Sequence, residues 1–435
     1  MHRSSWSFLS LARPALAAFS LICASVAAAG GVPERITAAE FGGDVAFVRA
    51  MIARMHPDPA FSTDTSAMHL ALDRMAQDVP PTLTRDEAWR RLASLNPLLA
   101  DGHFFIGYPD WRKETRAWLA EGGSLFPLEV TVDPDGALYR SDGSDAGRVR
   151  VVSVNGVAAG ELVSTLSSTV HGDTPRFRAS LLGQRWWLFY WKTFGAPETY
   201  EVVLEDEGVR RTVTMSGRRT LPRVLEQEAR QPFDLAIGRD GRAVLTVDSF
   251  SLADPAPFLA FTRDAFARMR EQGTTSLVID VSRNGGGDDA AWLDGLMPYL
   301  ATQPYRTGST FRGLTRGPVG APAKPMHGEI GTWRQPEPDN PLRFQGRTEV
   351  RIGPATYSSA ILFANVMRDF GFATLVGAGG AARQSQSGGV RDARLPHSGL
   401  TITLPRFILD PPAGGRPGAL LETTVDADRQ SQVSS

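Results

Sequence analysis

Residues 353-GPATYSSAILFANVMRDFGFATLVG-377 join a polar run, Thr-Tyr-Ser-Ser at 356–359, to a strongly patterned apolar stretch. The apolar side chains recur at the spacing of one helical face, at Ala360, Phe363, Ala364, Met367 and Phe370. We predict a helix over about 359–370, followed by a strand at 373–377. The polar run therefore opens the helix, where Ser358 or Ser359 is placed to cap it.

Outward from this segment, strands and helices alternate from about residue 243. Strands are predicted at 243–250, 276–281 and 347–353, and helices at 255–273 and 290–302. Buried strands that alternate with helices favour a mixed α/β core. The Gly- and Pro-rich run 312–340 is predicted to be a long loop or lid.

Two further regions precede this core. Residues 37–99 carry apolar side chains at helical spacing, and Thr84 with Glu87 has the form of a capping box. Residues 125–215 alternate like strands and are interrupted by a helical insert at 178–195. Within them, 149–166 resembles the PDZ-type run in which a strand ends at Asn-Gly and a helix follows. The expected domains are a helical segment at 30–115, a PDZ-like middle domain at 116–217 and the α/β core at 218–435.

The N-terminus has the layout of a secretory signal peptide. Arg3 and Arg13 precede an uncharged stretch, 14–29, that ends in three alanines. The stretch is shorter than the roughly 20 apolar residues of a membrane span. We therefore expect cleavage after Ala29 and an exported protein, periplasmic or secreted, with no stable membrane span; a buried N-terminal helix is the alternative.

Composition narrows the chemistry. The chain has 435 residues, 42% of them hydrophobic, and a formal net charge of -1, which is ordinary for a globular protein and unlike a nucleic-acid binder. Cys23 is the only cysteine, and it lies in the predicted signal peptide. The mature chain would have no thiol, which excludes a cysteine nucleophile, disulfides and thiolate metal sites.

The serines before the helix have two interpretations. A serine that caps a helix is by far the commoner arrangement. The same position also suits a nucleophile, because the free N–H groups and the dipole of a helix N-terminus stabilise negative charge. The residues of this segment alone leave both interpretations open.

A second motif is 277-LVIDVSRNGGGDDAAW-292, in which a strand ends at a run of three glycines before a helix. It has neither the Gly-Lys-Ser/Thr ending of a P-loop nor the spaced glycines of a dinucleotide fingerprint. The run is therefore either a tight turn or a source of backbone N–H donors for an oxyanion. A third motif, 98-LLADGHFFIG-107, carries His103, a candidate base for a serine nucleophile.

Together these motifs resemble the tail-specific (C-terminal processing) serine peptidases, especially their tricorn-core-like branch. The resemblance spans roughly residues 85–430 and rests on Asp-Gly-His, the PDZ-like segment, the Gly-rich turn and Thr-x-Ser-Ser-Ala. It implies a ClpP/crotonase-like α/β spiral core. It also implies that Ser358 is the nucleophile and that the oxyanion hole uses the amides of Ser359 and Gly286, with Gly285 as the neighbouring choice.

The family's processing branch uses a lysine base, and the matching position here is Arg383. Arginine stays protonated and cannot act as a base. The tricorn-like branch uses a histidine before the PDZ segment, which implies His103, with an acidic residue near the C-terminus. Glu422 is the nearest match for that acid, and Asp426 and Asp428 are its competitors.

We therefore expect an exported serine peptidase that acts on a peptide or protein without a metal, nucleotide or other cofactor; whether it forms a homo-oligomer is left open. The alternative is a non-catalytic protein on the same fold that binds a peptide or an apolar ligand. The missing lysine and the aromatic cluster at 186–194 motivate this alternative. The same cluster is better explained by a buried helix that packs against the core.

Overall fold

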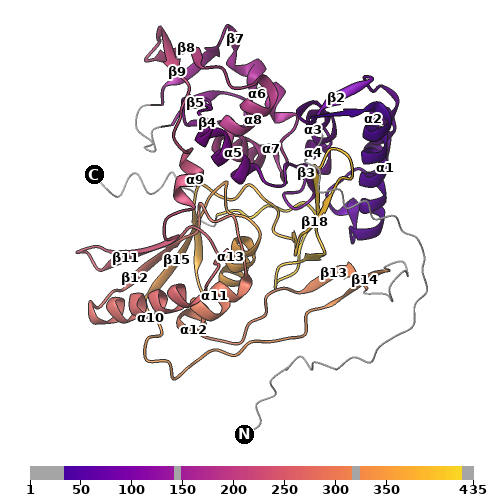
Figure 1. The fold of residues 1–435 in the computed structure, drawn as a ribbon. Coiled ribbons are helices and arrows are strands. Elements are labelled where there is room, and N and C mark those ends of the chain that lie inside the picture. The colour runs from indigo at the N-terminus through magenta and orange to yellow at the C-terminus, as the bar shows by residue number, and fades with distance from the viewer. Residues whose placement is uncertain (1–33, 142–147, 316–323, 424–435) are drawn as a thin grey trace, which may run out of the picture.

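The computed structural model describes residues 34–141, 148–315 and 324–423. The predicted signal peptide, 1–29, lies outside the described residues. Figure 1 shows the N-terminal helices beside the β-rich middle region, with the α/β core below both. No helix among the described residues has the length and apolar character that crossing a membrane requires.

The core is built on a five-stranded sheet with mixed α/β topology, as predicted. Its strands, in spatial order, are β10 (Phe233–Ile237), β11 (Arg242–Val247), β12 (Ser276–Asp280), β15 (Arg347–Ile352) and β16 (Thr374–Gly377). The last four run parallel, and β10 pairs antiparallel with β11. The core helices are α10 (Ala256–Glu271), α11 (Asp289–Gly295), α12 (Met297–Leu300) and α13 (Ser359–Asp369).

Parallel pairing brings two of the sequence motifs to one edge of this sheet. The Gly-rich turn follows the carboxyl end of β12, and Ser358 follows the carboxyl end of its neighbour β15. Ligands of open α/β sheets bind at this edge. The central strand β12 is apolar because it is covered on both faces, and Leu277, Val278 and Ile279 are fully buried.

A second sheet corrects the prediction for 312–340. Its order is β14 (Pro325–Glu329), β13 (Thr310–Leu314), β20 (Phe407–Leu409) and β17 (Gln386–Gly388). Part of the predicted loop is therefore a strand, because 325–329 pairs antiparallel with β13. Strand β17 also carries Gln386 and Ser387 into the functional site.

A third sheet connects the N-terminal region to the core. It consists of β18 (Arg391–Arg394), β19 (Thr401–Leu404) and β3 (Phe105–Gly107). Strand β3 begins two residues after His103 and pairs antiparallel with β19, so that Ile106 faces Ile402. This long-range pairing fixes the position of His103.

The N-terminal region is helical, as predicted. Its elements are β1 (Arg35–Thr37), α1 (Ala38–Met55), η1 (Pro59–Phe61), α2 (Thr65–Gln77), β2 (Thr82–Thr84), α3 (Arg85–Ala93) and α4 (Asn96–Leu99). The predicted capping box is confirmed: the Thr84 side chain accepts from the Glu87 N–H, and Glu87 Oε2 accepts from the Thr84 N–H at 2.7 Å. A second box joins Thr37 and Glu40 at the start of α1.

The middle region forms its own antiparallel sheet. Its strands are β4 (Val130–Val132), β5 (Leu138–Arg140), β6 (Arg150–Val154), β7 (Val157–Ala158), β8 (Thr199–Asp206) and β9 (Val209–Ser216). Its helices, with the short helix that leads into the core, are α5 (Trp111–Ala120), α6 (Ala159–Ser167), α7 (Pro175–Gln184), α8 (Trp186–Phe194) and α9 (Arg223–Gln227). The insert predicted as one helix is thus two helices that break at Arg185.

Candidate active site

Ser358 has a strained backbone at the start of α13. Its φ of 52° and ψ of -125° lie outside the common regions for a residue with a side chain. The Ser358 side chain makes no capping hydrogen bond, so the capping interpretation is wrong for this residue. Its N–H donates instead to Gln386 Oε1 at 3.1 Å, from strand β17. Such strain is commonly held at functional sites, where it presents a side chain clear of its own helix.

Ser359, by contrast, has a structural side chain. It is only 2% exposed. Its Oγ donates to Asp289 Oδ1 at 2.5 Å and accepts from Trp292 Nε1 at 3.0 Å. Both bonds tie α13 to α11. The hydroxyl of Ser358 is therefore the one that remains available for chemistry.

The Gly-rich turn lies directly against Ser358. A Cβ on Gly286 would be 2.6 Å from Ser358 Cβ and 2.9 Å from the Tyr357 carbonyl oxygen, and Gly286 has φ 102°. Only glycine suits both this conformation and this approach. The Tyr357 N–H donates to the Asn284 carbonyl at 3.0 Å, which holds the two segments together.

The three predicted oxyanion donors differ in availability. The Gly286 N–H is engaged, because it donates to Asn284 Oδ1 at 2.8 Å. Within the described part of the chain, the N–H groups of Ser359 and Gly285 have no acceptor. In this conformation the free donors next to Ser358 are therefore Ser359 and Gly285, and the preference for Gly286 over Gly285 as donor is not supported.

His103 is held by a serine and an aspartate. Its Nδ1 is 3.1 Å from Ser387 Oγ, and that hydroxyl donates to Asp101 Oδ1 at 2.8 Å. The same Asp101 oxygen accepts the His103 backbone N–H at 2.7 Å. Because the Ser387 hydrogen is directed at Asp101, its oxygen accepts from Nδ1–H, and the lone pair of the neutral imidazole is on Nε2. Burial lowers the pKa of His103 to about 4, although Asp173 and Ser387 oppose the shift, so the imidazole is neutral at neutral pH.

His103 contacts the residue that precedes Ser358 and makes no described hydrogen bond to Ser358 itself. The imidazole lies against the ring of Tyr357, the residue before Ser358, with ring centroids 4.8 Å apart. No hydrogen bond joins His103 to Ser358 in the described structure. In unliganded sites such bonds are often long and tighten only when substrate binds.

A buried polar network lies beneath these residues. Tyr357 Oη donates to Asp173 Oδ1 at 2.8 Å and accepts the Gly102 N–H at 2.9 Å. Arg383 donates its backbone N–H to Asp173 Oδ2 at 3.0 Å, and its guanidinium is 3.5 Å from the same oxygen. Burial raises the pKa of both Asp101 and Asp173. Arg383, at the position of the family's lysine, thus supplies a countercharge to a buried carboxyl.

The acid predicted at the C-terminus does not lie behind His103. Glu422 is exposed and makes no described hydrogen bond or ion pair. Asp426 and Asp428 lie outside the described residues. Asp101, linked through Ser387, is the carboxylate that the structure places behind His103. The Asp-Gly-His motif contains this aspartate, whereas no sequence pattern indicates Ser387, which joins the site from a strand 284 residues away.

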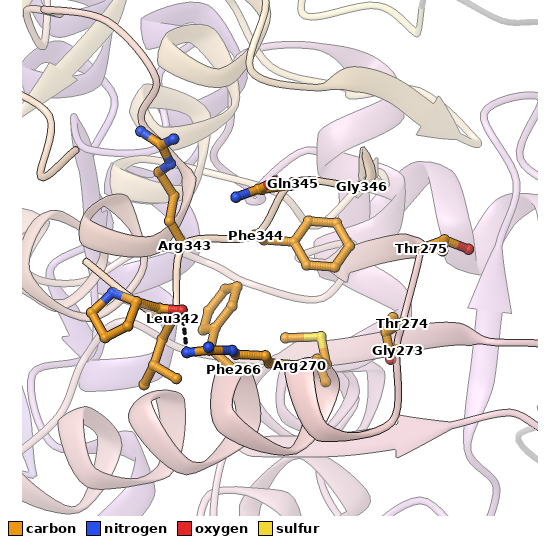
Figure 2. A pocket seen from close by; sticks show the side chains of 12 residues that line it. Phe266, Arg270, Gly273, Thr274, Thr275, Leu342, Arg343, Phe344, Gln345 and Gly346 are labelled. Atoms are coloured by element: carbon orange, nitrogen blue, oxygen red, sulfur yellow. Dashed lines mark hydrogen bonds between the residues drawn. The ribbon is translucent and has the colours of Figure 1, made fainter. Parts of the chain in front are cut away.

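A cavity of about 400 Å³ lies elsewhere in the core, between the end of α10 and residues 341–346. Figure 2 shows Phe266 and Arg270 from the helix facing Phe344, with Arg270 donating to the Pro341 carbonyl at 2.8 Å. The cavity borders Thr275 and Gly346, which precede β12 and β15. It is therefore at the opposite edge of the sheet from Ser358.

Comparison with known proteins gives a family and a fold. Residues 242–414 match the family model described as Peptidase family S41. Comparison with curated proteins gave no match. Mature CPAF is similar in structure, with TM-score 0.63 and 14% identity over 89% of this chain and 92% of that chain. CPAF complexed with lactacystin gives the same TM-score and identity over 89% and 94% of the two chains.

A photosystem II D1 C-terminal processing protease also matches, with TM-score 0.48 and 15% identity over 89% of this chain and 92% of that chain. The two CPAF matches, at 14% identity, indicate a shared fold only. The matched family region contains the Gly-rich turn, Ser358, Arg383 and Ser387, while His103 and Glu422 lie outside it. The α/β core and its motifs agree with the family expected from the sequence: residues 242–414 match peptidase family S41.

Proposed function

We propose that this chain hydrolyses peptide bonds through Ser358 as nucleophile and His103 as general base. The observation that carries the proposal is the strained Ser358, packed against Gly286, with the free N–H of Ser359 beside it. The neutral imidazole of His103 packs against the ring of Tyr357, the residue that precedes Ser358. These are the parts that acyl transfer requires: a nucleophile, a base and oxyanion donors.

The reaction follows from the tautomer of His103. Ser358 Oγ attacks the carbonyl carbon of the scissile bond while its proton passes to Nε2 of His103. The carbonyl oxygen becomes an oxyanion that accepts the N–H groups of Ser359 and Gly285. The proton on Nε2 then moves to the leaving nitrogen as the C–N bond breaks, leaving an acyl-enzyme. Water, deprotonated by Nε2, attacks the ester, and the proton returns to Ser358 as the acid product leaves.

Asp101 and Ser387 are positioning residues in this scheme. When Nε2 gains a proton, the imidazolium retains its Nδ1–H, which donates to Ser387 Oγ, and the Asp101 carboxylate behind it stabilises the positive charge. Substrate binding must also bring Nε2 into hydrogen-bond reach of Ser358 Oγ.

We also propose that the chain resembles the tricorn-like branch, because its proposed base is a histidine. Arg383 cannot take up a proton, and its guanidinium is committed to Asp173 and to the Ala100 carbonyl at 2.8 Å. We further propose export after cleavage at Ala29, to the periplasm or outside the cell, and a PDZ-like role for the middle region, residues 116–217. The layout of residues 1–29 and the sequence 149–166 support these two proposals.

A fluorophosphonate probe tests the nucleophile directly. It should label the wild-type chain and fail to label Ser358→Ala. Ser359→Ala is the matched control, because it removes the neighbouring hydroxyl and keeps the backbone N–H groups. Equal labelling of wild type and Ser358→Ala would overturn the assignment of Ser358.

The rival proposal is a non-catalytic protein that binds a ligand through the aromatic cluster. Most of that cluster is core: Trp186, Trp187, Phe189 and Tyr190 are 1%, 3%, 6% and 4% exposed. Burial of this kind favours packing over an open groove. Absence of both labelling and peptide hydrolysis in the folded wild-type chain would favour the rival.

A further inference from the structure

A second cavity, of about 220 Å³, lies between the N-terminal helices, α8 and the three-stranded sheet. Its walls are largely aromatic, with Phe105, Trp111 and Phe189 among the lining residues. Phe105 follows His103 by two residues, so the cavity is next to the catalytic cluster. None of the residues assigned above to catalysis lines it.

Arg185 is the unusual member of this cavity. Among the described residues, the Arg185 side chain makes no hydrogen bond and no ion pair. Its Nε is buried without a partner. Its guanidinium carbon is 5.0 Å from the centroid of the Trp111 ring. Burial, with a smaller contribution from Arg112, lowers the pKa of Arg185 to about 10, so it remains cationic at neutral pH.

The other cations of the cavity are already paired. Arg112 binds Glu228 with Nη2 2.8 Å from Oε1, and Lys192 donates to Glu114 Oε1 at 2.5 Å. Arg185 is therefore the cation whose donors remain free. The Arg185 side chain is half-buried and its Nε is enclosed without a partner. A ligand carboxylate would satisfy its free donors in two-point geometry.

Two other polar groups define the remainder of the site. His171 stacks on Phe105, with ring centroids 3.8 Å apart and an interplanar angle of 10°. Burial, reinforced by the positive charge of Arg185, holds the pKa of His171 well below its usual range, so the ring is neutral. Its nitrogens have no described hydrogen-bond partner, and the one that carries the proton can donate to an anion. The carboxylate of Asp392, also in the lining, accepts from Thr403 Oγ1 at 2.7 Å.

We propose that this cavity binds a carboxylate carried on an apolar or aromatic group. The carboxylate pairs with the Arg185 guanidinium and accepts from His171, and the apolar part packs against Trp111, Phe105 and Phe189. The proposal is independent of the catalytic assignment. The carboxylate can belong to a small molecule, to the end of a peptide or to an acidic side chain of a peptide, and the same contacts serve all three.

An alternative role for Arg185 is purely structural, as a cation stacked on Trp111. The two roles predict different stabilities. A buried cation without hydrogen bonds contributes little to folding, so Arg185→Gln should leave the melting temperature within a few degrees of wild type. A structural cation would lower it clearly when removed.

Calorimetric titration with 3-phenylpropionate tests the proposal on the full-length protein. We expect saturable binding to the wild type, and binding roughly 10- to 100-fold weaker to Arg185→Gln, as for loss of a charge-assisted hydrogen-bond pair. The neutral analogue 3-phenylpropionamide should bind the wild type more weakly by a similar factor, which tests the charge without any mutation. Arg263→Gln, at an arginine whose side chain is 66% exposed on α10, is the matched control and should bind like wild type.

The source of the carboxylate is distinguished by competition on the Ser358→Ala variant, which cannot cleave peptides. Displacement of 3-phenylpropionate by a Phe-terminated peptide acid, and not by its amide, identifies a chain end. Displacement by an amidated peptide containing Glu, and not Gln, identifies an acidic side chain. Displacement by neither identifies a small molecule. The proposal is overturned if 3-phenylpropionate does not bind the wild type. It is also overturned if 3-phenylpropionate binds Arg185→Gln as tightly as the wild type, or if 3-phenylpropionamide binds the wild type as tightly as 3-phenylpropionate does.

Discussion

The Nδ1 atom of His103 is 3.1 Å from the hydroxyl oxygen of Ser387, a residue that reaches the site from strand β17. Ser387 in turn donates to Asp101. This hydroxyl relays the charge of a buried carboxylate to the imidazole and fixes its tautomer. In the proposed mechanism, Asp101 acts through this hydroxyl as the acid of a Ser-His-Asp triad acts directly.

Removing the relay should slow catalysis without unfolding the protein. Ser387→Ala should lower kcat by roughly 10- to 100-fold, a fraction of the roughly 10²–10⁴ that acid–base catalysis contributes. Ser387→Thr retains the hydroxyl and should recover much of the loss. Because Ser387 acts through His103, the acidic limb of the pH–rate profile should shift in Ser387→Ala. An unchanged kcat, or a loss that Thr does not rescue and that leaves the limb in place, would argue against the relay.

The pH dependence of activity should report an unusually acidic histidine. Burial lowers the pKa of His103 to about 4, and the base must be unprotonated to accept the serine proton. Activity should therefore rise as pH increases through about 4 and be nearly constant by pH ~6.5, where an unperturbed histidine would still be half protonated. Steady-state kcat/KM measured from pH 3.5 to 8 checks this, over the range in which circular dichroism shows the native fold. A limb centred near 6.5 or higher would contradict it.

Ser358 and His103 should behave as one unit. Ser358→Ala and His103→Ala should each remove nearly all activity, and the double variant should be scarcely worse than either single one. Peptide hydrolysis measured side by side on the three folded variants tests the coupling. Additive losses, or substantial activity in His103→Ala, would separate the histidine from the nucleophile.

Replacing Gly286 by alanine should reduce activity far more than the same replacement at a glycine that also has a positive φ but has no atom close to the added Cβ. Gly286→Ala adds a Cβ 2.6 Å from Ser358 Cβ at φ 102°, so it should displace the nucleophile and remove most of the activity. Gly273→Ala is the control: its φ is 63°, and nothing lies within 4 Å of the added carbon. It should cost about 1 kcal/mol of stability and little activity. Comparable activity losses in the two variants would mean that the contact with Ser358 is unimportant.

His56 should make the fold sensitive to acid. Its side chain is 4% exposed beside Phe104, and burial lowers its pKa to about 3. Between pH ~6.5 and 3 the unfolded chain binds a proton at His56 that the folded chain does not, so stability falls as pH falls. At pH 4.5 this amounts to roughly 2–3 kcal/mol. His56→Asn cannot take up that proton, and denaturant titrations should show its pH slope reduced over 4.5–6.5; parallel slopes would refute the assignment.

The sequence indicated those parts of the site that are local in the chain. The apolar periodicity predicts α13, the three glycines predict the turn, and Asp-Gly-His brings both His103 and Asp101. The relay through Ser387 was not predictable, because it depends on the position of β17 in a sheet with β13 and β20. The availability of each oxyanion N–H was also hidden, since it depends on whether Asn284 turns its side chain toward Gly286.

The conformation of Ser358 was also not predictable from the sequence. Its place before a helix indicates a cap, and only its φ of 52° shows that the hydroxyl is turned away from that role. Strain of this kind is imposed by tertiary contacts, here with Gly286 and Gln386. Local sequence preference therefore predicts the common structure, a capping serine. The difference between that prediction and the observed backbone points to Ser358 as the candidate functional residue.

The pairing of β3 with β19 makes peptidase competence a property of the assembled chain. The α/β core holds the proposed nucleophile and oxyanion amides. The proposed base, His103, lies two residues before the three-residue strand β3, which the pairing of Ile106 with Ile402 docks onto the core. A chain whose first hundred residues have not yet docked carries a serine with nothing to deprotonate it. In the proposed mechanism, peptide hydrolysis therefore begins only after the N-terminal region has docked onto the core.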